Sequence, residues 1–255
     1  MKKGLLIIDR GSKMKEVQQE LFDTCSKIKA KTDYYYVDYC FLEVLPPFIG
    51  DGIKKCIENG VDSITVVPYF LYPGMKLKDA VSQTAKFSKN PDTKVVITKP
   101  LSYQPVISKI VLDRLNFVMN QKKGYSRNNN SSILLIGHGS SDRRARDAFL
   151  YTIDYLKTLF KNVNYCFLEL EYPDIEEGIA HCISSNPDSI FVIPYFLHKG
   201  IHIQKDIIIE IDKALKKYNF KNLYISDHIG VDPLIIDLII NLSKEAEIHS
   251  GLFKH

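Results

Sequence analysis

Short apolar runs alternate with longer amphipathic stretches along the whole chain. In the second half the apolar runs are residues 133–136, 163–168, 189–193 and 223–225. After the last run, apolar residues recur at helical spacing, namely Leu234, Ile235, Leu238, Ile239 and Leu242. Buried strands that alternate with helices are typical of a parallel sheet covered by helices on both faces. We therefore expect an α/β fold with four strands in each half and right-handed crossovers.

The chain also contains a long internal repeat. The recurring segments are YCFLEV (39–44) with YCFLEL (165–170), PYFLYPG (68–74) with PYFLHKG (194–200), and LLIIDRGS (5–12) with ILLIGHGS (133–140). The first two pairs are 126 residues apart and the third is 128 residues apart. A repeat of this length indicates a duplicated domain rather than a solenoid.

A polar segment separates the two copies. Residues 121–131 are rich in lysine, asparagine and serine and show no apolar periodicity, which is typical of a linker. The sequence therefore predicts an N-terminal domain at 1–120, a linker at 121–131 and a C-terminal domain at 132–255.

Composition excludes several classes of protein. Hydrophobic residues are 45% and charged residues 25% of the chain, as in ordinary globular domains, and the net charge is +4. We expect no nucleic-acid partner, because the positive balance is mild, and no membrane span, because no apolar run approaches about 18 residues. The apolar stretch near Met1 is too short for a signal peptide, so we expect a cytoplasmic protein. The five cysteines form no CxxC pair, which disfavours a disulfide framework or a cysteine zinc site.

Four side chains that can bind metal or carry protons follow the predicted strands of the second half. They are His138, Glu169, His202, in the loop predicted after the third strand, and His228. Ligands of open α/β sheets bind beyond the carboxyl ends of the strands, so these residues share one edge. Two imidazoles and a carboxylate suit a borderline divalent ion such as cobalt, iron, nickel or zinc. We also expect Gly137 and Gly139 to let backbone and ligand approach closely.

Other chemistries lack their motifs. No G-x-G-x-x-G or G-x-x-x-x-G-K-[ST] is present, so we expect no nucleotide cofactor. No G-x-S-x-G is present either, and Ser140 near His138 is a weak signal for nucleophilic catalysis. Asp9-Arg10-Gly11 raises a histidine phosphatase as an alternative, although neither half has the R-H-G that this class requires.

Three segments carry a family resemblance. ILLIGHGSSDRRA, CFLELEYPDIEEGI and IFVIPYFLHKGIHIQKDI resemble the sirohydrochlorin chelatases, the class II tetrapyrrole chelatases of cobalamin and sirohaem synthesis. The resemblance implies two tandem chelatase-like, flavodoxin-like sheets related by a pseudo-twofold axis, with the active site in the cleft between them. It also implies that His138 and His202 bind or deliver the metal, with Glu169 beside them.

The first half departs from this pattern. Arg10 and Lys76 stand where His138 and His202 stand in the second half, whereas Glu43 matches Glu169. The ligand set is therefore expected in the C-terminal half, and the N-terminal site is degenerate. Two cations repel a divalent ion and attract carboxylates, so the N-terminal half is expected to clamp the carboxylates of the substrate.

The expected reaction is ATP-independent insertion of a divalent metal, Co²⁺ first and Fe²⁺ or Ni²⁺ next, into sirohydrochlorin by a metal chelatase, a lyase. His138 and His202 are expected to deliver the metal and accept protons, with Glu169 accepting a proton or supporting the metal. The residues expected to bind the anionic substrate are Arg10, Lys76, Ser140, Arg143 and Lys199. A non-catalytic tetrapyrrole or metal carrier is the alternative. The duplication makes a monomer plausible.

Overall fold

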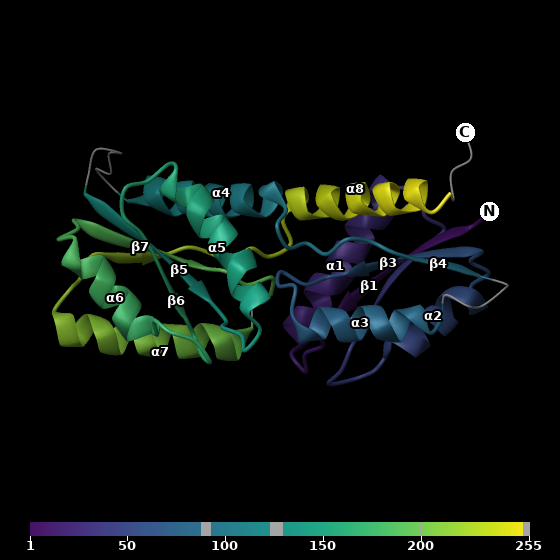
Figure 1. The fold of residues 1–255 in the computed structure, drawn as a ribbon, viewed down its shortest axis with the longest axis horizontal. Coiled ribbons are helices and arrows are strands. Elements are labelled where there is room, and N and C mark those ends of the chain that lie inside the picture. The colour runs from purple at the N-terminus through teal and green to yellow at the C-terminus, as the bar shows by residue number, and fades with distance from the viewer. Residues whose placement is uncertain (88–92, 123–129, 199, 252–255) are drawn as a thin grey trace. The chain divides into compact units, whose positions relative to one another are not determined.

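The computed structural model describes residues 1–255 apart from 88–92, 123–129, 199 and 252–255, and apart from the side chains of residues 201–204. Within these residues the chain forms two four-stranded parallel sheets, in the orders β2-β1-β3-β4 and β6-β5-β7-β8 (Figure 1). The strands of the first sheet are β1 (Lys3–Asp9), β2 (Tyr36–Phe41), β3 (Ser63–Pro68) and β4 (Lys94–Ile97). Those of the second are β5 (Ser131–Gly137), β6 (Val163–Phe167), β7 (Ser189–Pro194) and β8 (Leu223–Ile225). The predicted α/β fold class is confirmed.

The central strands are apolar throughout because helices cover both faces of each sheet. All six residues of β3 and of β7 are buried. The two sheets have matching registers, with Leu5 opposite Val37 in the first and Ile133 opposite Val163 in the second. Because side chains alternate along a strand, Leu134 and Ile136 point to the face opposite that of Ile133 and Leu135.

In the first sheet, α2 (Ile49–Glu58) and α3 (Met75–Ala85) cover one face. Ile49, Ile53 and Ala80 pack there against Leu6 and Ile8 of β1. The helices α1 (Lys15–Lys31) and α8 (Pro233–His249) cover the other face, and Figure 1 shows α8 on the side of the sheet opposite α3.

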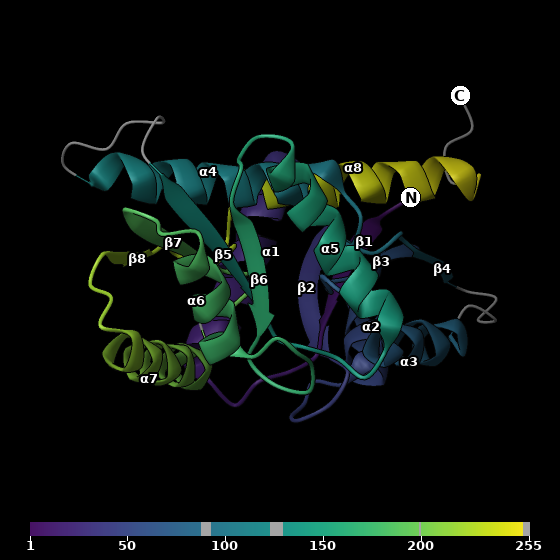
Figure 2. The same ribbon diagram turned by 60° about the vertical axis from the view of Figure 1, so that its left-hand side comes forward.

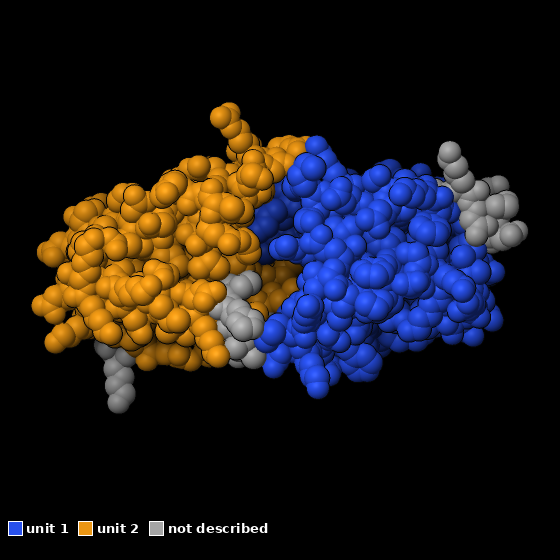
Figure 3. All heavy atoms as spheres, turned by 90° about the horizontal axis from the view of Figure 1, so that it is seen from below, with its two compact units in different colours: residues 1–102, 231–255 blue, residues 103–230 orange. Residues whose placement is uncertain are grey.

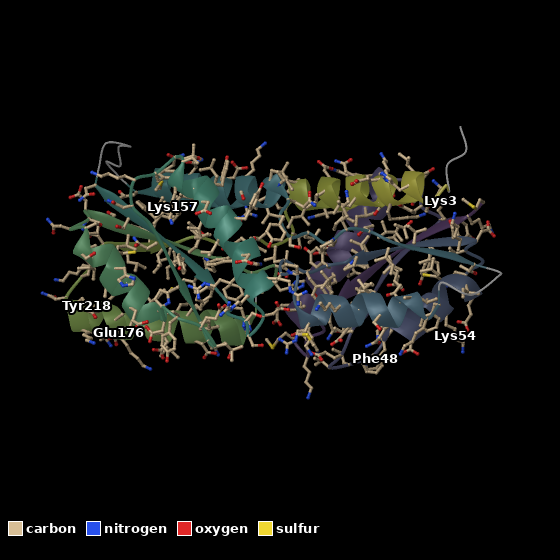
Figure 4. The ribbon with its side chains drawn as sticks, in the orientation of Figure 1. Lys3, Phe48, Lys54, Lys157, Glu176 and Tyr218 are labelled. Carbon is tan, nitrogen blue, oxygen red and sulfur yellow. The ribbon has the colours of Figure 1, made fainter. Side chains whose placement is uncertain are left out.

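The second sheet is covered in the same way. One face carries α6 (Ile175–Ser184) and α7 (Ile201–Tyr218), and the other carries α4 (Pro105–Gln121) and α5 (Arg143–Lys157) (Figure 2). Lys217 on α7 pairs with Glu176 on α6, which is labelled in Figure 4. The aspartates that precede α5 and α6, Asp142 and Asp174, cap these helices by accepting backbone N–H bonds.

The last helix of each repeat packs on the sheet of the other repeat. Helix α4 contacts β7 and α5, and α8 contacts β3, β4 and α1. The compact units are therefore residues 1–102 with 231–255, and residues 103–230, coloured separately in Figure 3. These units differ from the predicted domains 1–120 and 132–255, because amphipathic helices can be exchanged between similar sheets. Most of the predicted linker lies outside the described residues.

A buried carboxylate fixes α8 on the first sheet. The side chain of Glu247, which is 3% exposed, accepts a hydrogen bond of 2.8 Å from Thr65 Oγ1 and another from Tyr34 Oη. It also forms a 3.1 Å ion pair with Lys3, the residue labelled at the start of β1 in Figure 4. The position on α4 that matches Glu247 in the repeat holds Met119, which is buried. The two exchanged helices thus present different chemistry to their sheets.

No helix in the described part of the chain is long and apolar enough to cross a membrane. All five cysteines are free and buried. Burial raises the pKa of the Cys56 and Cys182 thiols to about 12, which keeps them protonated near neutral pH.

Candidate active site

The loop after β5 and the loop after β6 are joined by backbone hydrogen bonds. Leu168 N–H donates to the carbonyl of Gly137 over 2.9 Å, and Glu169 N–H donates to that of His138 over 3.0 Å. Both loops follow the carboxyl ends of parallel strands, where ligands of such sheets bind. The backbone contact therefore places the side chains of His138 and Glu169 at the same edge of the sheet.

Gly139 makes this loop contact possible. Its φ angle is +92°, and a Cβ atom there would lie 1.8 Å from the carbonyl oxygen of Glu169. Only glycine tolerates both the dihedral angle and the close approach. The sequence predicts close approach of backbone and ligand at this glycine, and in the structure the neighbour is the protein's own loop.

The side chains of His138 and Glu169 are in contact. His138 Nδ1 lies 3.2 Å from Glu169 Oε1, with the two side chains 30% and 55% exposed. The imidazole also lies beside the ring of Phe196, with 6.2 Å between the ring centroids. Since the carboxylate is close to Nδ1, Nε2 is the nitrogen that can face a metal ion, an arrangement common among metal-binding histidines. Glu169 lies two residues beyond the end of β6.

The remaining predicted ligands are placed differently. Residue 202 is the second residue of α7, which begins directly after Gly200, and not part of a loop. Its side chain and all of Lys199 lie outside the described residues. His228 lies three residues beyond β8, and its carbonyl accepts a 3.1 Å hydrogen bond from Arg114. Among the described side chains, no group of three His, Cys, Asp or Glu is arranged to hold a metal.

The first repeat brings its matching residues together around one carboxylate. Arg10 Nε donates to Glu43 Oε1 over 2.9 Å, and Lys76 Nζ donates to Glu43 Oε2 over 2.6 Å. These hydrogen bonds, first that from Lys76 and then that from Arg10, hold the pKa of Glu43 below its usual value. Gly11 adopts a φ of +107°, and a Cβ there would lie 2.2 Å from the carbonyl oxygen of Glu43. The first repeat therefore has the same loop contact, with an ion triad in place of a histidine and a carboxylate.

The predicted substrate-binding residues near α5 have several partners. Ser140 N–H donates to Glu171 Oε2 over 2.9 Å, and Ser140 Oγ accepts from the backbone N–H of Asp142 over 3.1 Å. Arg143 is exposed at the first position of α5, whereas Arg144 pairs with Asp142. Arg143 is thus the arginine of this group that is best placed to reach a ligand in solution.

Glu171 is a further residue of these loops that the sequence pattern does not predict. Its carboxylate accepts the Ser140 N–H bond and lies 3.6 Å from Arg146, whose guanidinium lies over the rings of Tyr165 and Phe167. The available signal was the comparison of repeats, because Leu45 stands where Glu171 stands in the second copy. Glu171 ties the loop after β6 to the start of α5.

Comparisons with known proteins agree with the duplication. Residues 4–117 and residues 132–246 each match the CbiX family. The sirohydrochlorin ferrochelatase of Bacillus subtilis (strain 168) is 27% identical over 254 residues, which cover 98% of this chain and 94% of that protein. The sirohydrochlorin cobaltochelatase of Priestia megaterium is 27% identical over 257 residues, which cover 95% of this chain and 79% of that protein. The structure of SirB from Bacillus subtilis with Fe³⁺ has a TM-score of 0.82 at 26% identity and covers 100% of this chain and 99% of that one.

Proposed function

The chain belongs to the CbiX family, in two tandem copies, and we propose that it inserts a divalent metal ion into sirohydrochlorin without ATP. The observation that carries this proposal is the contact between His138 Nδ1 and Glu169 Oε1 at the carboxyl edge of the second sheet. Relatives of nearly the same length include a sirohydrochlorin ferrochelatase and a sirohydrochlorin cobaltochelatase. The metal we favour is Co²⁺, followed by Fe²⁺ and Ni²⁺. All three ions accept imidazole and carboxylate ligands.

Insertion exchanges one divalent ion for two pyrrole N–H protons. His138 Nε2 binds the incoming ion, while the Glu169 carboxylate beside Nδ1 holds the ring in place. When the ion passes to the macrocycle, Nε2 is left without a metal and takes up one pyrrole proton, because imidazole accepts protons near neutral pH. Glu169, which is exposed beside the ring, is the acceptor for the second proton and passes it to water.

His202 is the second ligand in this proposal. Its backbone position matches that of Lys76, the second residue of α3, whose Nζ reaches Glu43 at 2.6 Å. A histidine at this position can bind a divalent ion through a ring nitrogen, where the lysine of the first repeat supplies a charge of its own. The first repeat therefore supports a site in the second in which His138 and His202 bind the ion and Glu169 supports His138.

We further propose that the first repeat binds carboxylates of the substrate. Two cations and one carboxylate leave the Arg10–Glu43–Lys76 triad with a net charge of +1. Arg10 uses Nε for Glu43, so its terminal N–H groups are the donors for a substrate carboxylate. Ser140, Arg143 and Lys199 complete the predicted set of substrate contacts in the second repeat.

The experiment is a metal-insertion assay followed by absorbance. Sirohydrochlorin is mixed with Co²⁺, Fe²⁺, Ni²⁺ or Zn²⁺ and a low concentration of protein, against a protein-free control. We expect many turnovers per chain, and a loss of about 100-fold or more in His138→Ala. Conversion of a single equivalent per chain would indicate a carrier, and equal rates with His138→Ala would contradict the assignment of the site.

A further inference from the structure

The two most exposed large hydrophobic side chains of the described residues lie in the loop that carries Glu169. Leu170 is 72% exposed and Tyr172 is 73% exposed. Single exposed apolar residues are ordinary on protein surfaces, but two on one loop beside a reactive pair call for an explanation. From their position we propose that Leu170 and Tyr172 form the surface on which one face of the tetrapyrrole rests. This proposal rests on the chelatase function proposed above.

The backbone of this loop is held in a fixed shape. Leu170 adopts a φ of +67°, a region that few residues other than glycine occupy. The backbone N–H of Glu171 donates to the carbonyl of Glu169 over 2.9 Å, and that of Phe167 donates to the carbonyl of Pro173 over 2.9 Å. Both ends of the loop are therefore tied down.

The side chain of Glu171 points inward, between the two exposed residues. Its carboxylate is 13% exposed and is used by the Ser140 N–H and by Arg146. Leu170 and Tyr172, its two neighbours in the sequence, face solvent. The polar residue is mostly shielded from solvent and the apolar residues are exposed, the reverse of what solvation alone favours.

The chemistry of the site identifies the occupant. A tetrapyrrole is a flat conjugated ring with apolar faces and, in sirohydrochlorin, a rim of carboxylates. An ion held by His138 can enter the ring only if a face of the ring lies close to the loop of Glu169, which contacts His138. The phenol ring of Tyr172 can stack on such a face and Leu170 can pack beside it. The exposed Arg143 at the start of α5 offers a charge for the carboxylate rim.

The first repeat presents the same loop with less apolar surface. Val44 has a φ of +77° and is 47% exposed, and Pro46 stands where Tyr172 stands in the second repeat. The aromatic ring thus occurs in the copy that carries His138. This difference fits a surface that serves metal insertion, and not a requirement of the fold.

The test compares Leu170→Ala/Tyr172→Ala with a control that removes two exposed apolar side chains elsewhere. Leu159, after α5, and Phe117, on α4, are 51% and 60% exposed and supply the control Leu159→Ala/Phe117→Ala. Sirohydrochlorin binding is measured by fluorescence titration, Co²⁺ binding by calorimetry and insertion by absorbance, with unfolding checked for each variant. We expect the KM and Kd for sirohydrochlorin to rise about tenfold in the loop variant. The Kd for Co²⁺ and the insertion rate at saturating sirohydrochlorin should change less than about threefold.

The single variant Tyr172→Phe keeps an aromatic ring that can stack on the tetrapyrrole. Its KM for sirohydrochlorin should therefore stay near that of the parent protein. If the parent protein is active and the loop variant has unchanged KM and Kd for sirohydrochlorin, the proposed contact of Leu170 and Tyr172 with the tetrapyrrole is wrong. The proposed chelatase function would not be affected by that result. A parent protein that neither binds sirohydrochlorin nor inserts metal would instead overturn the proposed function itself.

Discussion

Lys76 places its Nζ 2.6 Å from Oε2 of Glu43. The contact matters because Lys76 and residue 202 hold the same position in the two repeats, the second residue of a helix that follows the third strand. The carboxylate that Lys76 neutralises corresponds to Glu169, which contacts His138. In the first repeat the positive charge is thus part of the chain, and in the second we propose that a metal ion supplies it.

The presence of Arg10 and Lys76 where the second repeat has histidines predicts how many metal ions one chain binds. We expect the parent protein to bind one Co²⁺ per chain, because Arg10 and Lys76 occupy Glu43 and repel a divalent ion. The double variant Arg10→His/Lys76→His should bind two, since it restores two imidazoles beside a carboxylate. Calorimetric titration measures the stoichiometry, with Arg10→Gln/Lys76→Gln as a control that removes charge without adding ligands. Two equivalent ions in the parent protein would contradict the argument.

The carboxylate clamp predicts opposite effects from two members of the triad. Arg10→Ala lowers the net charge of the triad and should raise the KM for sirohydrochlorin several-fold. Glu43→Gln removes the internal competitor and should lower the KM. His138→Ala should instead weaken metal binding and leave the tetrapyrrole Kd almost unchanged. Steady-state kinetics and separate binding titrations distinguish these cases, and a normal tetrapyrrole Kd in Arg10→Ala would end the clamp hypothesis.

Gly139 should not tolerate a side chain. In Gly139→Ala the new Cβ would lie 1.8 Å from the Glu169 carbonyl oxygen, at a φ of +92°. We expect a loss of about 1–3 kcal/mol in stability and a larger loss of insertion activity, because the His138 and Glu169 loops must separate. Urea unfolding and the insertion assay measure the two effects. Gly74→Ala is the matched control, since nothing lies within 4 Å of a Cβ there.

The lowered pKa of Glu43 predicts how stability depends on pH. In the unfolded chain this carboxyl binds its proton at a higher pH than in the folded protein, so the pairs with Lys76 and Arg10 stabilise the fold above the unfolded pKa. That contribution is lost as the pH falls through the folded pKa. The difference in unfolding free energy between parent and Glu43→Gln should therefore be constant near neutral pH and shrink below about pH 4.5. Glu58→Gln, which removes an exposed glutamate near Lys54, is the control.

The buried carboxylate of α8 predicts a large effect from one residue. Glu247→Met introduces the residue found at the matching position of α4, and it leaves Thr65 and Tyr34 without their acceptor. We expect a loss of roughly 3 kcal/mol in the free energy of urea unfolding. Adding Thr65→Val and Tyr34→Phe should recover much of it, because the unsatisfied hydroxyl groups are removed. A triple variant no more stable than the single one would show that the cost lies elsewhere.

Local patterns of the sequence predicted the strands and the position of His138 and Glu169 at one edge of the second sheet. The run at 223–225 is β8 as observed, and the run at 163–168 exceeds β6 by one residue. A strand buried on both faces must be apolar throughout, and this requirement is readable from neighbouring residues alone. His138 and Glu169 could be paired from the sequence because each follows a strand, and parallel strands end at the same edge.

Tertiary structure decided what depends on distant partners. The apolar faces of α4 and α8 fit any similar sheet, so local sequence does not decide which sheet each helix covers. The exchange of these helices between repeats depends on contacts with residues far away in the sequence, such as those of Glu247 with Thr65 and Lys3. The sequence determined that Arg10 and Lys76 are cations, but only the fold brings both to Glu43. The sign of a charge is a property of one residue. Which carboxylate a cation contacts depends on strand order and on how closely Gly11 lets two loops approach.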